Sequence, residues 1–199
     1  MNTKYSDLID QTFHFPQKEF SVEKGQLSFH GIDLTELIKE HGTPLKFSYL
    51  PKISENIQNA KTWFKDAMEE HNYIGNYNYC YCTKSSHFSH VLEEVLKNDT
   101  HIETSSAFDI NIVESLEAKG KLGKNNFIIC NGFKGAQYAD NIARIINNGF
   151  KNCIPIIDNY QEISLLNEQI SGSYKIGIRI ASEEEPTFEF YTSRLGIGY

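Results

Sequence analysis

Residues 79–86 read Tyr79-Cys80-Tyr81-Cys82-Thr83-Lys84-Ser85-Ser86, a short run of aromatic and small residues that ends in a lysine and two serines. The run alternates as a β-strand does, and the apolar spacing of residues 91–96 predicts a helix behind it. α/β barrels commonly present reactive groups at the carboxyl ends of their strands. An amine held in a dry barrel mouth can lose its proton and condense with an aldehyde. Lys84 is therefore a candidate catalytic residue, against a background in which most lysines at strand ends are solvated surface charges.

A repeat of strand and helix runs through the rest of the chain. We predict strands at 77–84, 101–105, 126–131, 152–157 and 174–181, with helices at 87–98, 107–119, 138–147 and 161–169. A pitch of roughly 25 residues per strand–helix pair is typical of βα units. Residues 127–130 and 153–157 are almost continuously apolar, as expected of parallel strands buried on both faces. The fold class is therefore α/β, as part of a (β/α)8 barrel of about five units or as a doubly wound sheet.

Residues 1–42 look like a separate lead-in made of a strand at 26–32 and a helix at 33–40. Asp33 is expected to cap that helix and Gly42 to stop it. A strand at 45–49 and a long helix that Ser54 could cap then open the second region, residues 43–199. No sixth strand–helix pair follows Ala181, so we expect this region to be an incomplete barrel domain.

Composition excludes several classes of function. The net charge is −7 and the pI about 5.5, with no cluster of lysine and arginine, which argues against a nucleic-acid or membrane-surface partner. The polar N-terminus lacks an apolar signal core, and no apolar run approaches the ~18 residues of a membrane helix, so we expect a cytoplasmic protein. The four cysteines all fall in predicted strands and are expected to be reduced core residues. We identify no metal-binding motif and no glycine-rich phosphate loop.

Six short motifs occur in an order and spacing that together are fairly specific. They are Gly42-Thr43-Pro44-Leu45, Tyr81-Cys82-Thr83-Lys84, Ile102-Glu103-Thr104-Ser105-Ser106-Ala107-Phe108-Asp109, Ile129-Cys130-Asn131-Gly132-Phe133-Lys134, Ile178-Arg179-Ile180-Ala181 and Ser193-Arg194-Leu195-Gly196. Residues 26–199 thereby resemble the pyridoxal-phosphate amino-acid decarboxylases of the alanine racemase-like barrel fold, which include ornithine, diaminopimelate and biosynthetic arginine decarboxylases. The motif at 129–134 resembles the arginine decarboxylases in particular. Two positions depart from the family pattern: Ser86 stands where asparagine is usual, and Asp109 where glutamate is common.

The resemblance implies a pyridoxal 5'-phosphate cofactor held by Lys84, with Glu103 and Arg179 as further cofactor-binding residues. Arg179 is expected on a buried strand, where it needs an acidic partner such as Glu103 or the phenolate edge of the cofactor. Asp109 is expected to act as an acid at the start of its helix rather than on the substrate. Magnesium is implied by the family resemblance alone. The implied reaction is decarboxylation of a basic amino acid, first arginine to agmatine, in polyamine and spermidine biosynthesis.

Alternatives stay open at this point. The substrate could be ornithine, lysine, diaminopimelate or a carboxylated polyamine. The protein could also be an inactive decarboxylase-like regulator, or a five-stranded doubly wound binding module. Family members continue through further barrel strands and a β-domain, which complete the site across a dimer. We therefore interpret the chain as the N-terminal portion of such an enzyme, inactive alone and a homodimer or higher homo-oligomer when full length.

Overall fold

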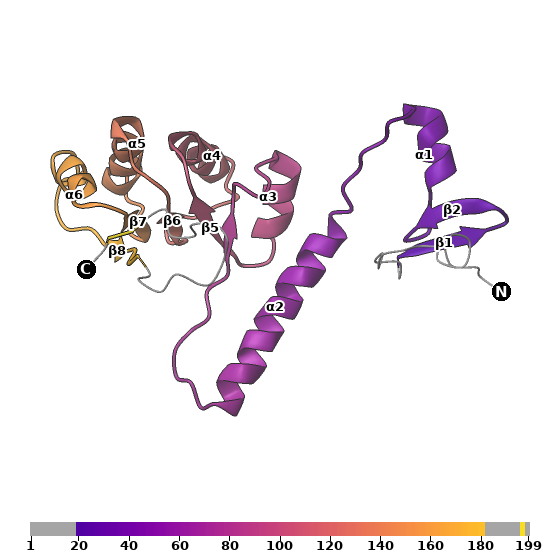
Figure 1. The fold of residues 1–199 in the computed structure, drawn as a ribbon, viewed down its shortest axis with the longest axis horizontal. Coiled ribbons are helices and arrows are strands. Elements are labelled where there is room, and N and C mark those ends of the chain that lie inside the picture. Colours follow the sequence, from indigo (N-terminus) through magenta and orange to yellow (C-terminus); the bar gives the residue numbers. More distant parts are fainter. Residues whose placement is uncertain (1–18, 182–195, 198–199) are drawn as a thin grey trace, which may run out of the picture. The chain divides into compact units, whose positions relative to one another are not determined.

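The computed structural model describes residues 19–181 and 196–197, and the chain divides into two compact units, 1–48 and 49–199 (Figure 1). Each unit is described by itself. The polar N-terminus, the acidic run at 183–185 and residues 193–195 of the last motif lie outside the described residues.

The first unit is a small antiparallel sheet with one helix. Strands β1 (Phe20–Glu23), β2 (Gln26–Phe29) and β3 (Ile32–Asp33) pair in the order β1-β2-β3, and α1 (Leu34–His41) follows. Asp33 caps α1, since its Oδ1 accepts the N–H groups of Thr35 at 2.7 Å and Glu36 at 3.2 Å. Gly42 ends the helix with a φ of 78°, which glycine adopts without strain. The predicted helix and both of its end signals are confirmed. The single strand predicted at 26–32 is instead two antiparallel strands, β2 and β3, and β1 was missed.

The second unit begins with the long helix α2 (Pro51–Glu70). Two predictions for this stretch are wrong. Residues 45–49 form no strand, and Ser54 does not cap the helix, because α2 already begins at Pro51. Ser54 lies inside the helix and donates its hydroxyl to Glu94 Oε1 at 2.6 Å, which ties α2 to the next helix.

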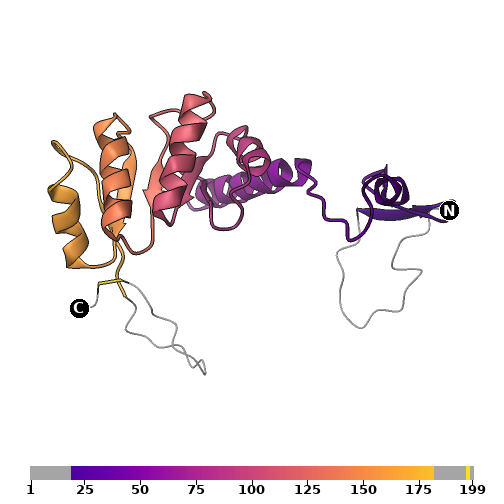
Figure 2. The same cartoon turned by 90° about the horizontal axis from the view of Figure 1, so that it is seen from above.

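Five strands and four helices then alternate. They are β4 (Cys80–Cys82), α3 (Ser89–Leu96), β5 (His101–Thr104), α4 (Ala107–Ala118), β6 (Ile128–Cys130), α5 (Ala136–Asn147), β7 (Cys153–Ile157), α6 (Tyr160–Asn167) and β8 (Gly177–Ile178). The strands form one parallel sheet in the order β4-β5-β6-β7-β8. Helices α3 to α6 lie side by side along one face of this sheet in both views (Figures 1 and 2). The predicted α/β class and its strand–helix repeat are confirmed, with strands shorter than predicted.

The two faces of the sheet differ in burial. Tyr81, Ile102, Ile128 and Cys153 form one cross-strand row, and the last three are at most 1% exposed beneath the helices. Burying such an aliphatic side chain stabilises the fold by about 1.5–3 kcal/mol. The next row alternates to the other face and contains Cys82, Glu103, Ile129 and Ile154, all only partly buried. This second face is the one that a barrel turns inward, and it carries the polar groups of the site.

Candidate functional site

Lys84 lies two residues beyond the end of β4, at the carboxyl edge of the sheet. The backbone before it is anchored to β5, because the N–H and hydroxyl of buried Thr83 donate to the Glu103 carbonyl at 3.0 and 3.1 Å. The chain then turns, with Ser85 N–H donating to the Cys82 carbonyl at 3.1 Å. The Lys84 side chain itself is exposed. The expected dry mouth is therefore not formed by the described residues, since the sheet ends at β4 on one side and at β8 on the other.

Glu103 lies on the inner face of β5 and is held from both neighbouring strands. Its Oε1 accepts the side-chain amide of Asn131 at 3.1 Å and the Cys82 thiol at an Sγ–Oε1 distance of 3.7 Å. Burial raises the pKa of the Cys82 thiol, and the Glu103 charge adds to the rise, so the thiol stays protonated and can donate. Three adjacent strands thus converge on one carboxylate. The contacts of Glu103 are with Cys82 and Asn131 rather than with Lys84, so Lys84 is linked to it through the β4 backbone.

The segment that follows β6 is a tight turn. Gly132 has a φ of 80°, and a Cβ there would lie 3.1 Å from the Ser105 carbonyl oxygen, so glycine is required. The turn brings Lys134 into a fully buried position, where its ammonium donates to the Gly132 carbonyl at 2.7 Å and to the Ile156 carbonyl.

Lys134 pairs with Glu162, which is 1% exposed, at an Nζ–Oε2 distance of 3.4 Å. Glu162 also accepts the backbone N–H of Lys134 at 2.9 Å and that of Asp158 at 3.0 Å. This buried pair joins the turns that follow β6 and β7. Sequence reasoning missed this pair, although Lys134 lies only four residues after the buried strand β6.

The expectation for Arg179 is corrected in two respects. Its side chain is 42% exposed rather than buried, and its acidic neighbour is Asp158 rather than Glu103, with 4.0 Å between Nη1 and Oδ1. Ile178 and Ile180 on either side are each 62% exposed. The reason is position: β8 is the last strand of the sheet, so no further βα unit among the described residues covers it.

Asp109 lies in the first turn of α4 and is buried. Its Oδ2 accepts the backbone N–H of Ser105 at 2.9 Å. The carboxylate thus joins the end of β5 to the start of α4, which fits the expected role at the helix start. Among the described residues, the hydrogen bonds of the Asp109 carboxylate are with Ser105, and none is with Lys84 or Arg179.

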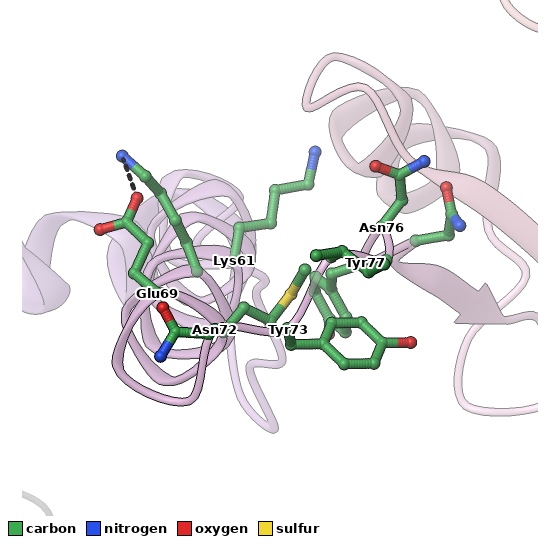
Figure 3. A pocket seen from close by; sticks show the side chains of 11 residues that line it. Lys61, Glu69, Asn72, Tyr73, Asn76 and Tyr77 are labelled. Carbon is green, nitrogen blue, oxygen red and sulfur yellow. Dashed lines mark ion pairs between the residues drawn. The ribbon is translucent and has the colours of Figure 1, made fainter.

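A pocket of about 770 Å³ lies elsewhere in the second unit (Figure 3). The last turns of α2 line it, together with residues 72–78, which precede β4. Tyr77 stacks on Phe64 there with 4.1 Å between ring centroids, and Lys65 pairs with Glu69. Residues 72–78 lead into the amino end of β4, whereas Lys84 follows its carboxyl end. The pocket is therefore at the opposite end of the strand from Lys84.

Within the described ranges 19–181 and 196–197, no group of three or more histidine, cysteine or acidic residues could hold a metal ion. Among those same residues, no helix has both the length and the apolar character needed to cross a membrane.

Comparison with known proteins gives similar sequences and similar folds. No protein-family model matches the chain. The biosynthetic arginine decarboxylase of Bacteroides thetaiotaomicron is 24% identical over 161 residues, which are 75% of this chain and 25% of that protein. The chain spans about a quarter of the length of the curated relatives that it matches.

Two solved structures share the fold. The biosynthetic arginine decarboxylase of Campylobacter jejuni superposes with a TM-score of 0.62 and 21% identity, over 81% of this chain and 29% of that one. The diaminopimelate decarboxylase of M. jannaschii in complex with L-lysine superposes with a TM-score of 0.72 and 18% identity, over 91% of this chain and 41% of that one. The predicted partial barrel is confirmed by this likeness. In sequence the chain resembles part of the arginine decarboxylases, and in fold it resembles part of the arginine and diaminopimelate decarboxylases, the group that its motifs predict.

Proposed function

We propose that the protein containing this chain is a pyridoxal-phosphate-dependent decarboxylase of a basic amino acid, with arginine as the first candidate substrate. The observation that carries the proposal is an accessible lysine at the carboxyl edge of β4, one strand from a carboxylate held by Cys82 and Asn131. The sequence similarity to arginine decarboxylases points to arginine. Residues 43–199 would form the N-terminal part of the barrel, and residues 1–42 the lead-in to a second β-domain.

The residues present fit the proposed cofactor. An aldehyde needs an amine that it can reach, and Lys84 is exposed at the edge where parallel-stranded enzymes place their reactive groups. Lys84 would hold the aldehyde group of the cofactor through its Nζ. When bound, the cofactor supplies an electron sink, which accepts the electron pair of the carbon–carbon bond that breaks when the substrate loses its carboxylate as carbon dioxide.

The other two predicted residues would orient charge around the cofactor. Glu103 is fixed by donors from β4 and β6, so its carboxylate would offer a rotationally restrained negative charge on the inner face of the sheet. Arg179, 42% exposed, would offer N–H groups to an anionic oxygen of the cofactor or the substrate. Full enclosure of the site would come from the remainder of the barrel. The full-length protein would be a homodimer or a larger homo-oligomer in the cytoplasm. Magnesium has no support here beyond the family resemblance.

The test is borohydride reduction of the full-length protein with pyridoxal phosphate, followed by peptide mapping. We expect a pyridoxyl group on Lys84 and its loss in Lys84→Arg, which keeps the positive charge but cannot form the reducible bond. Lys119→Arg, at the end of α4, is the matched control and should leave the labelling unchanged. No adduct, or an adduct on another lysine, would refute the proposed cofactor site.

Release of labelled carbon dioxide from arginine, ornithine, lysine and diaminopimelate would then identify the substrate. We expect arginine to react fastest. An adduct on Lys84 without release from any of them would instead support an inactive, decarboxylase-like regulator.

A further inference from the structure

Asp158, the residue directly after β7, has an unusual environment. Its side chain is 2% exposed, and within the described part of the chain both of its carboxylate oxygens are buried without a hydrogen-bond partner. Its backbone is well held, because Asp158 N–H donates to Glu162 Oε2 at 3.0 Å. A buried carboxylate that lacks both donors and a counter-charge is unfavourable by several kcal/mol. A cation nearby must therefore compensate it.

Among the described residues, Arg179 is the cation that pairs with Asp158, with Nη1 4.0 Å from Asp158 Oδ1. The buried ammonium of Lys134 is engaged elsewhere. It donates to the carbonyls of Gly132 and Ile156, and its charge is paired with Glu162.

The backbone register puts Arg179 in this place. Ile157 pairs with Ile178 across β7 and β8, and Arg179 N–H donates to the Ile157 carbonyl at 3.0 Å. Arg179 therefore stands beside Asp158 one step further along the two strands. Side chains on neighbouring parallel strands at the same step share a face, so the guanidinium lies over the buried carboxylate at the carboxyl edge.

We infer that Asp158 is a positioning residue that holds the guanidinium of Arg179 over the carboxyl edge of the sheet, for the cofactor or substrate anion of the proposed reaction. That Arg179 binds a cofactor or substrate anion rests on the proposed function. That Asp158 holds Arg179 rests on the geometry alone. A guanidinium has more N–H donors than one carboxylate can accept, so a paired Arg179 still presents donors to the site. Without Asp158, an exposed arginine on an edge strand would sample many rotamers.

The first test needs no cofactor. Arginine side-chain N–H signals are recorded in the full-length protein and in Asp158→Asn, which keeps the shape and removes the charge. We expect a slowly exchanging signal from Arg179 that is lost in Asp158→Asn. The control is Glu114→Gln, which removes the exposed partner of Arg144, 2.8 Å away, and should leave the Arg179 signal intact. An Arg179 signal unchanged in Asp158→Asn would overturn the inference, whether or not the protein binds pyridoxal phosphate.

The second test separates positioning from structure. With pyridoxal phosphate bound, the pH midpoint of the cofactor's visible absorbance should shift in Asp158→Asn and in Arg179→Gln in the same direction, by about one pKa unit. The double variant should shift no further than either single variant. An unchanged midpoint in Asp158→Asn, or shifts that add, would assign Asp158 a structural role only. If the wild type forms no cofactor absorbance band, the proposed function is refuted. The first test would still decide whether Asp158 holds Arg179.

If Asp158→Asn does not fold, Arg179→Gln takes its place. Removing the compensating cation should lower Tm by several degrees, whereas Lys65→Gln, which breaks the exposed pair with Glu69, should change Tm by about 2 °C or less. Equal effects of the two substitutions would contradict the inference.

Discussion

The central strands and the last strand of the sheet have similar amino-acid compositions and very different surroundings. In β6 and β7, Ile128 and Ile157 are 0% exposed, whereas Ile178 in β8 is 62% exposed. Helices α4 and α5 pack against the central strands. β8 pairs with β7 on one side, and among the described residues its other side has only an isolated bridge just beyond the strand, between Ile180 and Ile197. An apolar strand is therefore not by itself a buried strand; the next βα unit is what buries it.

Charged residues follow the same division. In the centre, Lys134 and Glu162 are at most 1% exposed and are satisfied by one another and by backbone groups. At the edge, Arg179 keeps 42% of its side chain in solvent and lies 4.0 Å from its partner Asp158. The central pair is fully enclosed and structural, whereas the edge pair combines a buried carboxylate with a partly exposed guanidinium that can still donate to a ligand.

Breaking the central pair should have the largest effect on stability. Lys134→Met keeps the aliphatic length but leaves Glu162 charged in a buried site, so we expect unfolding to become easier by about 3–5 kcal/mol. Urea denaturation of the full-length protein measures the change. Lys65→Met, which breaks the exposed pair of Lys65 with Glu69 in α2, is the control and should cost about 1 kcal/mol or less. Adding Glu162→Gln to Lys134→Met should restore part of the loss; no recovery would mean that packing rather than charge dominates there.

A matched pair of alanine substitutions should measure the difference between centre and edge directly. Ile128→Ala creates a cavity under the helices and should cost about 2–5 kcal/mol. In the 199-residue chain alone, Ile178→Ala removes a side chain that is already 62% exposed and should change stability, measured by urea denaturation, by about 0.5 kcal/mol or less. In the full-length protein, a loss comparable to that of Ile128→Ala would show that the rest of the barrel covers β8, as the proposed function requires.

The smallest effect concerns pH at the amino end of the central strands. Burial lowers the pKa of His101, with the Lys61 charge adding to and the Asp99 charge opposing the effect, and its Nδ1 accepts the Phe127 N–H at 3.3 Å. Above the unfolded pKa of about 6.5, the His101 ring is neutral in both the folded and the unfolded protein, so its full contribution to folding stability is present. As pH falls below about 6.5, the unfolded state binds a proton that the folded state does not, so stability declines until the pH reaches the lowered pKa of the folded state.

Urea midpoints at pH 7.5 and pH 5 measure this dependence. The wild type should lose more stability between the two values than His101→Gln, which retains a hydrogen-bonding side chain that does not titrate. The same loss in both proteins would assign the pH dependence to other groups.

Much of the architecture could be predicted from the chain alone, because strand and helix signals are local. The apolar runs at 126–131 and 152–157 and the helical spacing between them depend on residues only a few positions apart. The Asp33 cap and the Gly42 stop are local too, and both were correct. The strand expected at 45–49 failed because a strand requires a partner as well as a pattern.

Position at the carboxyl ends of the strands was likewise readable in advance for Lys84 and Glu103, whereas Arg179 was expected within a buried strand. Their partners were not. The contact of Glu103 with Asn131 joins residues 28 positions apart, and Arg179 meets Asp158 across another strand pair. The choice of partner depends on strand order and register, which no local pattern contains.

The sequence by itself determined the α/β repeat, the family resemblance and the residues that carry the proposed chemistry, because these depend on short-range spacing and residue type. Only the tertiary structure decided that Lys134 is buried and Arg179 exposed. Both are cations that follow apolar strands, and their burial depends on how many neighbouring units the folded sheet places around them.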